Sequence, residues 1–251
     1  MKVVLRIKRF QPEREEKTRT EDFEVEIDPR SRVLDALIFV ERRLDPSLTF
    51  RRSCGHGVCG SDAMVINGKE RLACKTLVRD VAKADGDVVT IEPLRCLETK
   101  RDLVVDERPF FELYRSVKPY LAAGEAPAGR ERRQSPAERK VIDETTNCIL
   151  CASCYSSCPV VQGTNPKFIG PAAIVQAFRF DEDSRDKGFA ERLPALDRPD
   201  GIWACENKFE CTRVCPRDIR VTWHINALKR HIERTKASSV TDHPSSRTEK
   251  A

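Results

Sequence analysis

The segment that decides the fold is CILCASCYSSCP, residues 148–159, which places four cysteines and a proline within twelve residues. The steps of three, three and four residues follow C-x2-C-x2-C-x3-C-P, the spacing of bacterial ferredoxins. A tight loop of this kind brings three thiolates to one cubic [4Fe–4S] cluster, and its fourth cysteine binds a second cluster. We therefore predict that Cys148, Cys151 and Cys154 share one cluster and that Cys158 serves another. Structural zinc sites have two separate C-x2-C pairs or histidines instead.

A second run supplies the remaining ligands of both clusters. It contains Cys205, Cys211 and Cys215, and the same spacing started at Cys205 requires a further ligand at position 208. That residue is Lys208, whose ammonium group cannot bind iron. A cuboidal cluster with three thiolates has one iron corner without a protein ligand. We therefore expect a [3Fe–4S] cluster on Cys158, Cys205 and Cys211, and a [4Fe–4S] cluster completed by Cys215.

A third cysteine group lies in CGHGVCGSDAMVINGKERLAC, residues 54–74. Plant-type ferredoxins have the spacing C-x4-C-x2-C followed by a later cysteine. Cys54 and Cys59 fit the first two positions, and Cys74 fits the last. The third position is occupied by Asp62. We predict a [2Fe–2S] centre with these four ligands, and three glycines in the loop allow the backbone to wrap closely around it. In the alternative, Asp62 is a surface loop residue and Ser61 or water completes the site.

The composition excludes several classes of protein. Of 251 residues 34% are charged, and the net charge of +5 gives no reason to invoke nucleic acid as a partner. No apolar run approaches the ~18 residues of a membrane span. The start, MKVVLRIKRF, alternates apolar and basic residues, which predicts a strand and not a secretory leader. We expect a reducing cytosol, where clustered cysteines bind metal. Ten of eleven cysteines then have a ligand role, and Cys96 has none.

Periodicity predicts two domains of different class. Residues 1–106 combine alternating strands with one helical segment, which indicates a small α+β domain. The predicted strands cover residues 2–10, 22–28 and 86–94, with a helix over 31–44 and a hairpin over 63–74 that turns at Asn67 and Gly68.

The second half is predicted to be helical. Residues 107–140 should form a connecting helix and a linker rich in Gly, Pro, Ser and charge, either flexible or packed as a surface loop on a partner. Residues 141–236 should form a helical domain. Its last helix carries an apolar stripe formed by Val221, Ile225, Leu228 and Ile232. Residues 237–251 are predicted to be disordered.

These segments resemble the iron–sulfur subunit of the succinate dehydrogenase/fumarate reductase family over nearly the whole chain. The resemblance rests on SCGHGVCGSDAMVINGKERLAC, RDLVVD, CILCASCYSSCP, NPKFIGPAA and CTRVCP. It implies an α+β fold, with an N-terminal plant-type ferredoxin-like β-grasp domain and a C-terminal all-α bacterial ferredoxin-like domain. An aspartate at the third two-iron position also occurs in some members of that family.

The resemblance also implies partners and a location. A flavoprotein subunit with FAD oxidises succinate, and electrons pass through the [2Fe–2S], [4Fe–4S] and [3Fe–4S] clusters to quinone at a membrane anchor. The anchor would hold this chain as a peripheral subunit on the cytoplasmic side of the inner (plasma) membrane of a prokaryote. No residue of the chain is expected to be catalytic in the sense of an acid, base or nucleophile. The sequence does not distinguish succinate oxidation from fumarate reduction.

The quinone edge departs from the family pattern. Members that use ubiquinone often carry Trp shortly after the equivalent of Pro159 and His just after the equivalent of Cys205. Here Gly163 and Glu206 stand in these two regions. We therefore expect a different quinone, menaquinone, at an edge formed by Pro159, Gly163 and Glu206. Glu206 is either a proton-handling group or a surface acid.

Two other classes of function compete with this interpretation. The first is a soluble electron carrier, or an adaptor for another oxidoreductase, and such proteins often have two intact four-cysteine runs. The second is a zinc-stabilised interaction protein. The gap at Lys208 and the fused two-iron domain favour the subunit of a respiratory complex.

Overall fold

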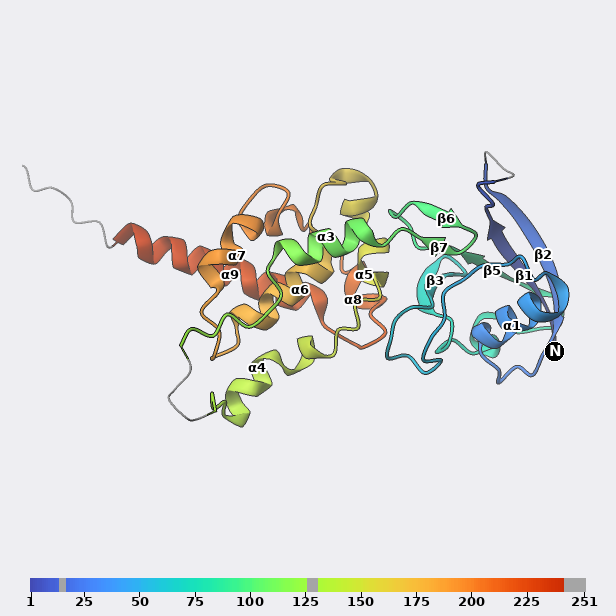
Figure 1. Cartoon of the computed structure of the whole chain (residues 1–251), viewed down its shortest axis with the longest axis horizontal. Coiled ribbons are helices and arrows are strands. Elements are labelled where there is room, and N and C mark those ends of the chain that lie inside the picture. The colour runs from blue at the N-terminus through green and yellow to red at the C-terminus, as the bar shows by residue number, and fades with distance from the viewer. Residues whose placement is uncertain (14–16, 126–130, 242–251) are drawn as a thin grey trace, which may run out of the picture.

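The computed structural model describes residues 1–13, 17–125 and 131–241. Figure 1 shows an elongated molecule with a β-sheet domain at one end and a helical domain at the other. The N-terminus lies in the sheet domain, and the last helix leads away from the opposite end. The predicted α+β architecture is confirmed.

The N-terminal domain is built on a five-stranded sheet in the order β2-β1-β5-β3-β4. Strands β1 and β5 are parallel, and the other neighbouring pairs are antiparallel. The strands are β1 Lys2–Arg9, β2 Arg19–Glu26, β3 Ala63–Ile66, β4 Lys69–Leu72 and β5 Asp87–Glu92. The predicted hairpin is confirmed, because Asn67 and Gly68 both have the positive φ angles that a tight turn between β3 and β4 requires.

Helices and a small ribbon complete this domain. Helix α1, Val33–Phe39, continues into a π-helical segment, Val40–Leu44, so the predicted helix over 31–44 begins two residues later. Its apolar residues pack with the inner face of the sheet, where Val3, Leu5 and Ile7 are buried by strict alternation along β1. The remaining elements are α2 Val78–Val81, β6 Thr99–Arg101 and β7 Val104–Val105.

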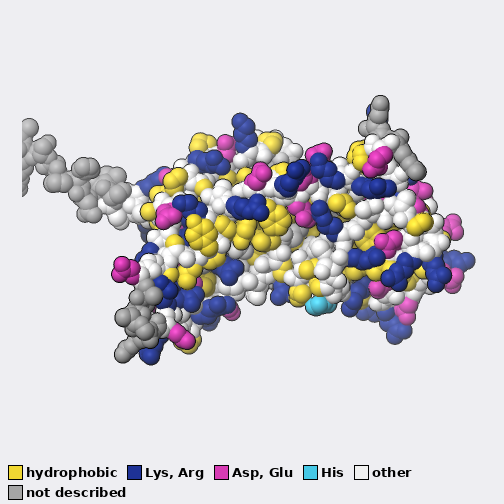
Figure 2. Space-filling view, viewed as in Figure 1, with side chains coloured by type: hydrophobic (Ala, Val, Ile, Leu, Met, Phe, Trp, Pro, Cys, Tyr) yellow, Lys and Arg dark blue, Asp and Glu magenta, His cyan; other side chains and the backbone are white. Residues whose placement is uncertain are grey.

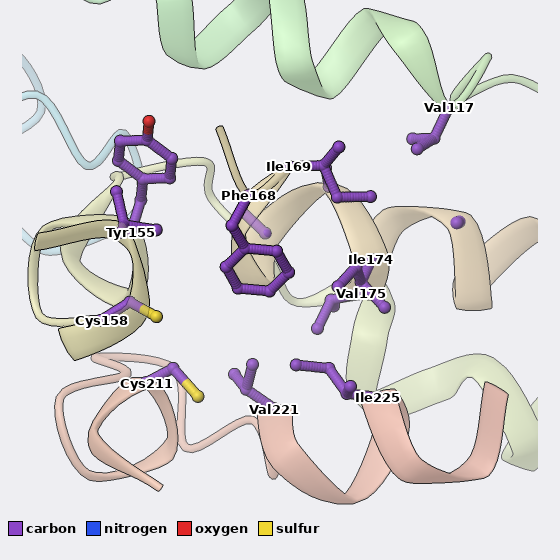
Figure 3. Packing of buried hydrophobic residues seen from close by; sticks show 14 of the residues in the cluster. Val117, Tyr155, Cys158, Phe168, Ile169, Ile174, Val175, Cys211, Val221 and Ile225 are labelled. Carbon is purple, nitrogen blue, oxygen red and sulfur yellow. The ribbon is translucent and has the colours of Figure 1, made fainter. Parts of the chain in front are cut away.

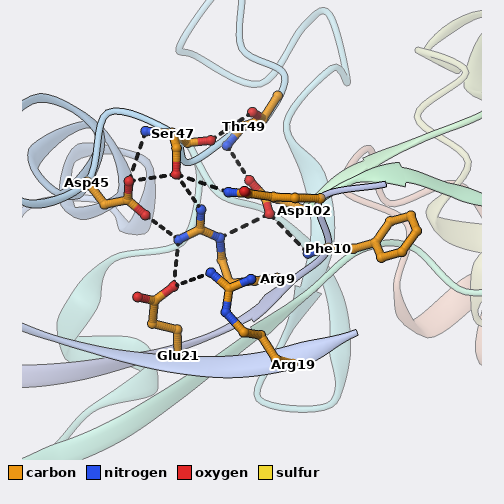
Figure 4. A network of polar contacts seen from close by, with 9 residues as sticks. Arg9, Phe10, Arg19, Glu21, Asp45, Ser47, Thr49 and Asp102 are labelled. Atoms are coloured by element: carbon orange, nitrogen blue, oxygen red, sulfur yellow. Dashed lines mark hydrogen bonds and ion pairs between the residues drawn. The ribbon is translucent and has the colours of Figure 1, made fainter. Parts of the chain in front are cut away.

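A buried arginine ties the ribbon to the sheet (Figure 4). The Arg9 side chain has no exposed surface and donates from Nε to Asp102, at 3.0 Å, and from Nη1 to Glu21 and Asp45. Asp102 also accepts from the backbone nitrogens of Phe10 and Thr49. A fully buried charge is tolerated only when it is paired and hydrogen-bonded in this way, so the network fixes the relative position of these segments.

The C-terminal domain is a bundle around α6. Its helices are α3 Arg108–Ser116, α4 Pro136–Thr146, α5 Ser153–Ser156, α6 Gly170–Asp181, α7 Phe189–Leu196, α8 Glu210–Arg213 and α9 Val221–Thr241, with a π-helical turn at Val160–Thr164 and a 3-10 turn at Ile202–Ala204. The apolar stripe of α9 is fully buried, as predicted. Figure 3 shows two of its members, Val221 and Ile225, facing Ile174 and Val175 of α6.

Two predicted boundaries are wrong. Helix α4 begins at Pro136, inside the predicted linker, because Ser135 caps it: its Oγ accepts from the backbone nitrogen of Glu138, and the Glu138 carboxylate accepts from the backbone nitrogen of Ser135. Helix α9 continues through residues 237–241, which were predicted to be disordered, since no Gly or Pro interrupts it before Pro244. Residues 126–130 of the predicted linker and 242–251 of the predicted tail lie outside the described residues.

A polar contact joins the two domains. Glu70 on β4 is 4% exposed, and its carboxylate accepts from Ser156 Oγ on α5 at 2.8 Å. The backbone nitrogen of Arg95 donates to the same hydroxyl at 2.8 Å, and the Arg95 guanidinium pairs with Glu70. The cysteine loops of the two domains are therefore held next to each other.

The surface gives no simple charge pattern on the face shown in Figure 2, where basic and acidic side chains are interspersed over both domains. Within the described ranges, no helix is both long and apolar enough to cross a membrane.

Candidate iron–sulfur sites

The structure gathers four cysteines of both runs around one cavity. Cys148, Cys151 and Cys154 come from the loop that enters α5, and Cys215 comes from the turn between α8 and α9. The rest of the lining is mainly apolar, including Ala172, Val175 and Val221, and the cavity has about 390 Å³ of empty space. Cys215 thus joins the first run in space, as the exchanged spacing predicts.

The backbone of this loop is strained in order to curl around the cavity. Leu150 and Ala152 both adopt left-handed conformations, with φ of 54° and 60°. Each costs ~1–2 kcal/mol for a residue with a side chain, and such strain concentrates at functional sites. On the other wall, burial raises the pKa of Cys215, and the nearby backbone nitrogens of Arg217 and Ile219 partly offset this rise. Backbone amides directed at sulfur favour the thiolate form that binds iron.

The thiols of this cavity are poorly suited to an empty site. Burial, together with the neighbouring Cys148 and Cys215, raises the pKa of Cys151 to about 11. Burial also raises the pKa of Cys154 well above its ordinary value. Four thiolates in one apolar space are stable only with a cationic group between them, because each charge otherwise destabilises the others. The donor set therefore fits a [4Fe–4S] cluster.

Three other cysteines border a second cavity. Cys158, Cys205 and Cys211 line it together with Phe168 and Thr222 among others, and it has about 290 Å³ of empty space. Figure 3 shows Cys158 and Cys211 on facing turns beside Phe168. Cys211 Sγ lies 3.4 Å from Thr222 Oγ1, a hydroxyl that can donate to sulfur. This three-sulfur set fits a cuboidal cluster with one unliganded corner.

Lys208 occupies the wall of this second cavity where a fourth cysteine would stand. Its side chain is 55% exposed, and its Nζ lies 3.4 Å from the Glu206 carboxylate. Glu206 and Pro159 of the predicted quinone edge also line the cavity. Gly163 is not among the described residues that line it and lies on the π-helical turn instead. The structure thus brings two of the three edge residues to this cavity.

The two-iron loop presents its first cysteine to backbone donors. The nitrogens of His56 and Val58 donate to Cys54 Sγ at 3.5 Å each. These donors, followed by Cys59, lower the pKa of Cys54 to about 6. The loop can fold this way because its three glycines, Gly55, Gly57 and Gly60, all have positive φ. Glycine adopts such φ angles without steric cost.

Asp62 is buried, so its interpretation as a surface loop residue is wrong. It is 2% exposed, and its Oδ2 accepts from the backbone nitrogen of Cys74 at 2.5 Å. Its Oδ1 is also buried and has no hydrogen-bond partner among the residues that the structure describes. Burial, together with the adjacent Asp62 carboxylate, raises the pKa of Cys74 to about 12. A buried carboxylate oxygen without a partner beside a thiol fits a metal ligand.

Ser61 remains the competing oxygen donor. Its Oγ lies 3.1 Å from Cys59 Sγ, in the same loop.

Across the described part of the chain, no group of three or more His, Cys, Asp and Glu side chains is arranged to hold a single metal ion.

The two-iron and four-iron loops touch at Gly60, a contact that sequence reasoning missed. A Cβ placed on Gly60 would lie 2.7 Å from Cys151 Cβ and 3.0 Å from its Cα. No side chain larger than hydrogen therefore fits between the loops without displacing one of them. The only sequence signal for this contact is a third glycine immediately after Cys59.

Comparisons with known proteins identify two iron–sulfur domains and the family of the chain. The chain matches the family model of a 2Fe-2S iron-sulfur cluster binding domain over residues 4–112 and that of a 4Fe-4S dicluster domain over residues 144–219. It is 41% identical to the succinate dehydrogenase iron-sulfur subunit of Coxiella burnetii, covering 89% of this chain and 94% of that protein. It is 37% identical to the fumarate reductase iron-sulfur subunit of Haemophilus influenzae, covering 88% and 89% of the two chains.

A solved structure has the same fold. A chain of the Mycobacterium smegmatis Sdh1 complex in the apo form superposes with a TM-score of 0.84 at 27% identity, covering 94% of this chain and 97% of that chain. Identity above 30% over nearly the full length of the curated relatives, together with both cluster-binding domains, leads to one conclusion. The chain belongs to the iron–sulfur subunit family of succinate dehydrogenase and fumarate reductase.

Proposed function

We propose that this chain is the electron-transfer subunit of a succinate dehydrogenase. It relays electrons from a flavoprotein subunit that carries FAD to quinone at a membrane anchor, on the cytoplasmic side of the inner membrane of a prokaryote. The observation that carries the proposal is the arrangement of the three cysteine groups. Two groups border adjacent cavities, and the loop of the third group contacts Cys151 of the first cavity through Gly60.

The proposed ligands are the residues at the ferredoxin-type spacings of the three cysteine groups. They are Cys54, Cys59, Asp62 and Cys74 for [2Fe–2S], Cys148, Cys151, Cys154 and Cys215 for [4Fe–4S], and Cys158, Cys205 and Cys211 for [3Fe–4S]. When bound, the clusters would supply one-electron redox chemistry. The protein holds the sulfurs, excludes water with apolar walls and directs backbone amides at Cys54. Such hydrogen bonds and burial set the potential of a cluster.

The direction of the reaction has two candidates. The relatives named above include both a succinate dehydrogenase and a fumarate reductase subunit, so the same subunit working in reverse in a quinol:fumarate reductase is the alternative. Direction depends on cluster potentials and on the quinone. Turnover of the purified complex with succinate and quinone, compared with fumarate and quinol, decides between them.

The quinone is proposed to be menaquinone, at an edge near Pro159, Gly163 and Glu206. The support is the absence of the ubiquinone-type Trp and His from the corresponding regions of the sequence, and the position of Pro159 and Glu206 on the three-thiol cavity. Glu206→Gln tests a proton-handling role. If this variant reduces quinone at the wild-type rate across the pH range, Glu206 is only a surface acid.

Purification under anaerobic conditions with all associated chains tests the whole proposal. We expect about nine irons per chain, from clusters of two, four and three irons, and an EPR signal of [3Fe–4S] in the oxidised protein. We also expect a flavin-containing partner and quinone-linked turnover. A full iron content with two [4Fe–4S] clusters and no flavoprotein would support the soluble carrier or adaptor, and a colourless zinc protein would support the interaction protein.

A further inference from the structure

A basic groove runs between the two domains. Among the described residues that line it, Cys215 is the one predicted cluster ligand. One side is β4 with the loop that follows it, and the other is the segment 213–216, which contains Cys215. The groove is open to solvent, with about 780 Å³ of empty space. Its charged lining consists of the cations Lys69, Arg71, Lys75 and Arg213 and the carboxylates Glu70 and Asp80.

The carboxylates of the groove do not neutralise its lysines. Glu70 is buried and already paired with Arg95, and Asp80 accepts from the backbone nitrogen of Leu77 at the start of α2. Arg213 forms an ion pair with Glu210. Within the described chain, Lys69, Arg71 and Lys75 form no ion pair, and the first two lie on the same side of β4 because strand residues alternate.

One nitrogen of the Arg71 guanidinium also lacks a hydrogen-bond acceptor among the described residues. Its Nε is buried from solvent and has no hydrogen-bond partner among the described residues. The three cations Lys69, Arg71 and Lys75 therefore make the groove complementary to carboxylates.

The position of the groove indicates which partner supplies these carboxylates. Lys75 follows Cys74, and its aliphatic stem packs over Gly57 of the two-iron loop, where a Cβ would lie 2.7 Å from Lys75 Cδ. The opposite wall carries Cys215 of the four-thiol cavity. None of the three thiols of the second cavity lines the groove. The groove thus flanks the entry side of the proposed electron path and lies away from its quinone side.

We propose that this groove docks an acidic segment of the flavoprotein subunit. This inference rests on the proposed function, which makes the flavoprotein the partner that delivers electrons at the two-iron site. Carboxylates between Lys69, Arg71 and Lys75 would fix the register of the two subunits and speed their association, as complementary charges do at other interfaces.

Charge reversal in the whole complex tests the proposal. The variant is Lys69→Glu/Lys75→Glu, since both side chains are exposed, and the matched control is Lys2→Glu/Lys17→Glu. Lys17 precedes β2, which lies at the opposite edge of the sheet from β4. We expect the variant to bind the flavoprotein at least about tenfold more weakly at physiological salt, measured as flavin per iron after affinity purification, and the control to match wild type. Iron content and EPR signals should be unchanged in both.

A second variant distinguishes a loss of docking from an effect of the Lys75 substitution on the adjacent two-iron site. Lys69→Glu alone, compared with Lys17→Glu, should show the same direction of loss, and a photo-crosslinking residue at position 69 should attach to the flavoprotein. Wild-type flavin content in both groove variants, or crosslinking to an anchor subunit, overturns the docking proposal and leaves the proposed function intact. A wild-type preparation without any flavoprotein overturns both.

Discussion

Replacement of Asp62 by asparagine separates its two roles. Asp62 Oδ2 accepts from the backbone nitrogen of Cys74 at 2.5 Å, whereas the buried Oδ1 has no hydrogen-bond partner in the described part of the chain. Asparagine retains an oxygen for the Cys74 amide, but its NH₂ group has no lone pair to offer iron. If Asp62 is a ligand, Asp62→Asn should lose the two-iron signal although the local hydrogen bond survives.

The expected size of each effect follows from the structure. Loss of the two-iron cluster should lower the iron content from about nine to about seven per chain. Asp62→Ala should lose the same iron and, in addition, leave the buried Cys74 nitrogen without an acceptor. It should therefore be ~1–3 kcal/mol less stable than Asp62→Asn. Asp62→Cys restores the plant-type ligand set and should keep about nine irons with an altered EPR signal.

Iron analysis, EPR of the reduced protein and thermal unfolding measure these outcomes together. Ser61→Ala is the matched control, because its hydroxyl is the nearest competing oxygen in the loop and lies 3.1 Å from Cys59 Sγ. Full iron content and an unchanged two-iron signal in Asp62→Asn would refute the assignment. If Ser61→Ala alone loses the signal, the oxygen ligand is Ser61.

Three further predictions concern other parts of the chain. Lys208→Cys supplies the missing ligand at the three-thiol cavity and should convert the [3Fe–4S] cluster to [4Fe–4S]. The EPR signal of oxidised [3Fe–4S] should then disappear, and its retention would contradict the prediction. Asp102→Ala leaves the buried Arg9 without one of its partners and should lower the free energy of unfolding by ~3–5 kcal/mol. The control Asp22→Ala removes an exposed ion pair and should have little effect on thermal unfolding. Burial raises the pKa of Asp181 to about 6 from an ordinary value of 3.8, so the folded state binds more protons between these pH values and loses that stability as pH rises through about 6. The neutral Asp181→Asn should therefore gain stability relative to wild type as the pH is raised from about 5 to about 7, and a constant difference in unfolding temperature would contradict this.

The cysteine spacing predicted which thiols the structure gathers in space. A C-x2-C-x2-C loop has so few rotatable bonds between its sulfurs that their meeting is a local property, readable from Cys148, Cys151 and Cys154 alone. The strands of the first domain, the turn at Gly68 and the buried stripe of α9 follow from period and turn chemistry, which are equally local. The ends of α4 and α9 were missed because a capping box at Ser135 and an uninterrupted helical run decide them.

The tertiary structure alone decided what lies between these local units. The burial of Asp62, the contact of Gly60 with Cys151 and the groove between β4 and the Cys215 turn each depend on residues that are distant in sequence. Spacing along a chain specifies which atoms can reach one another within a loop. It does not specify how two loops from different domains approach, because that distance is set by the packing of Glu70, Ser156 and Arg95 at the domain interface.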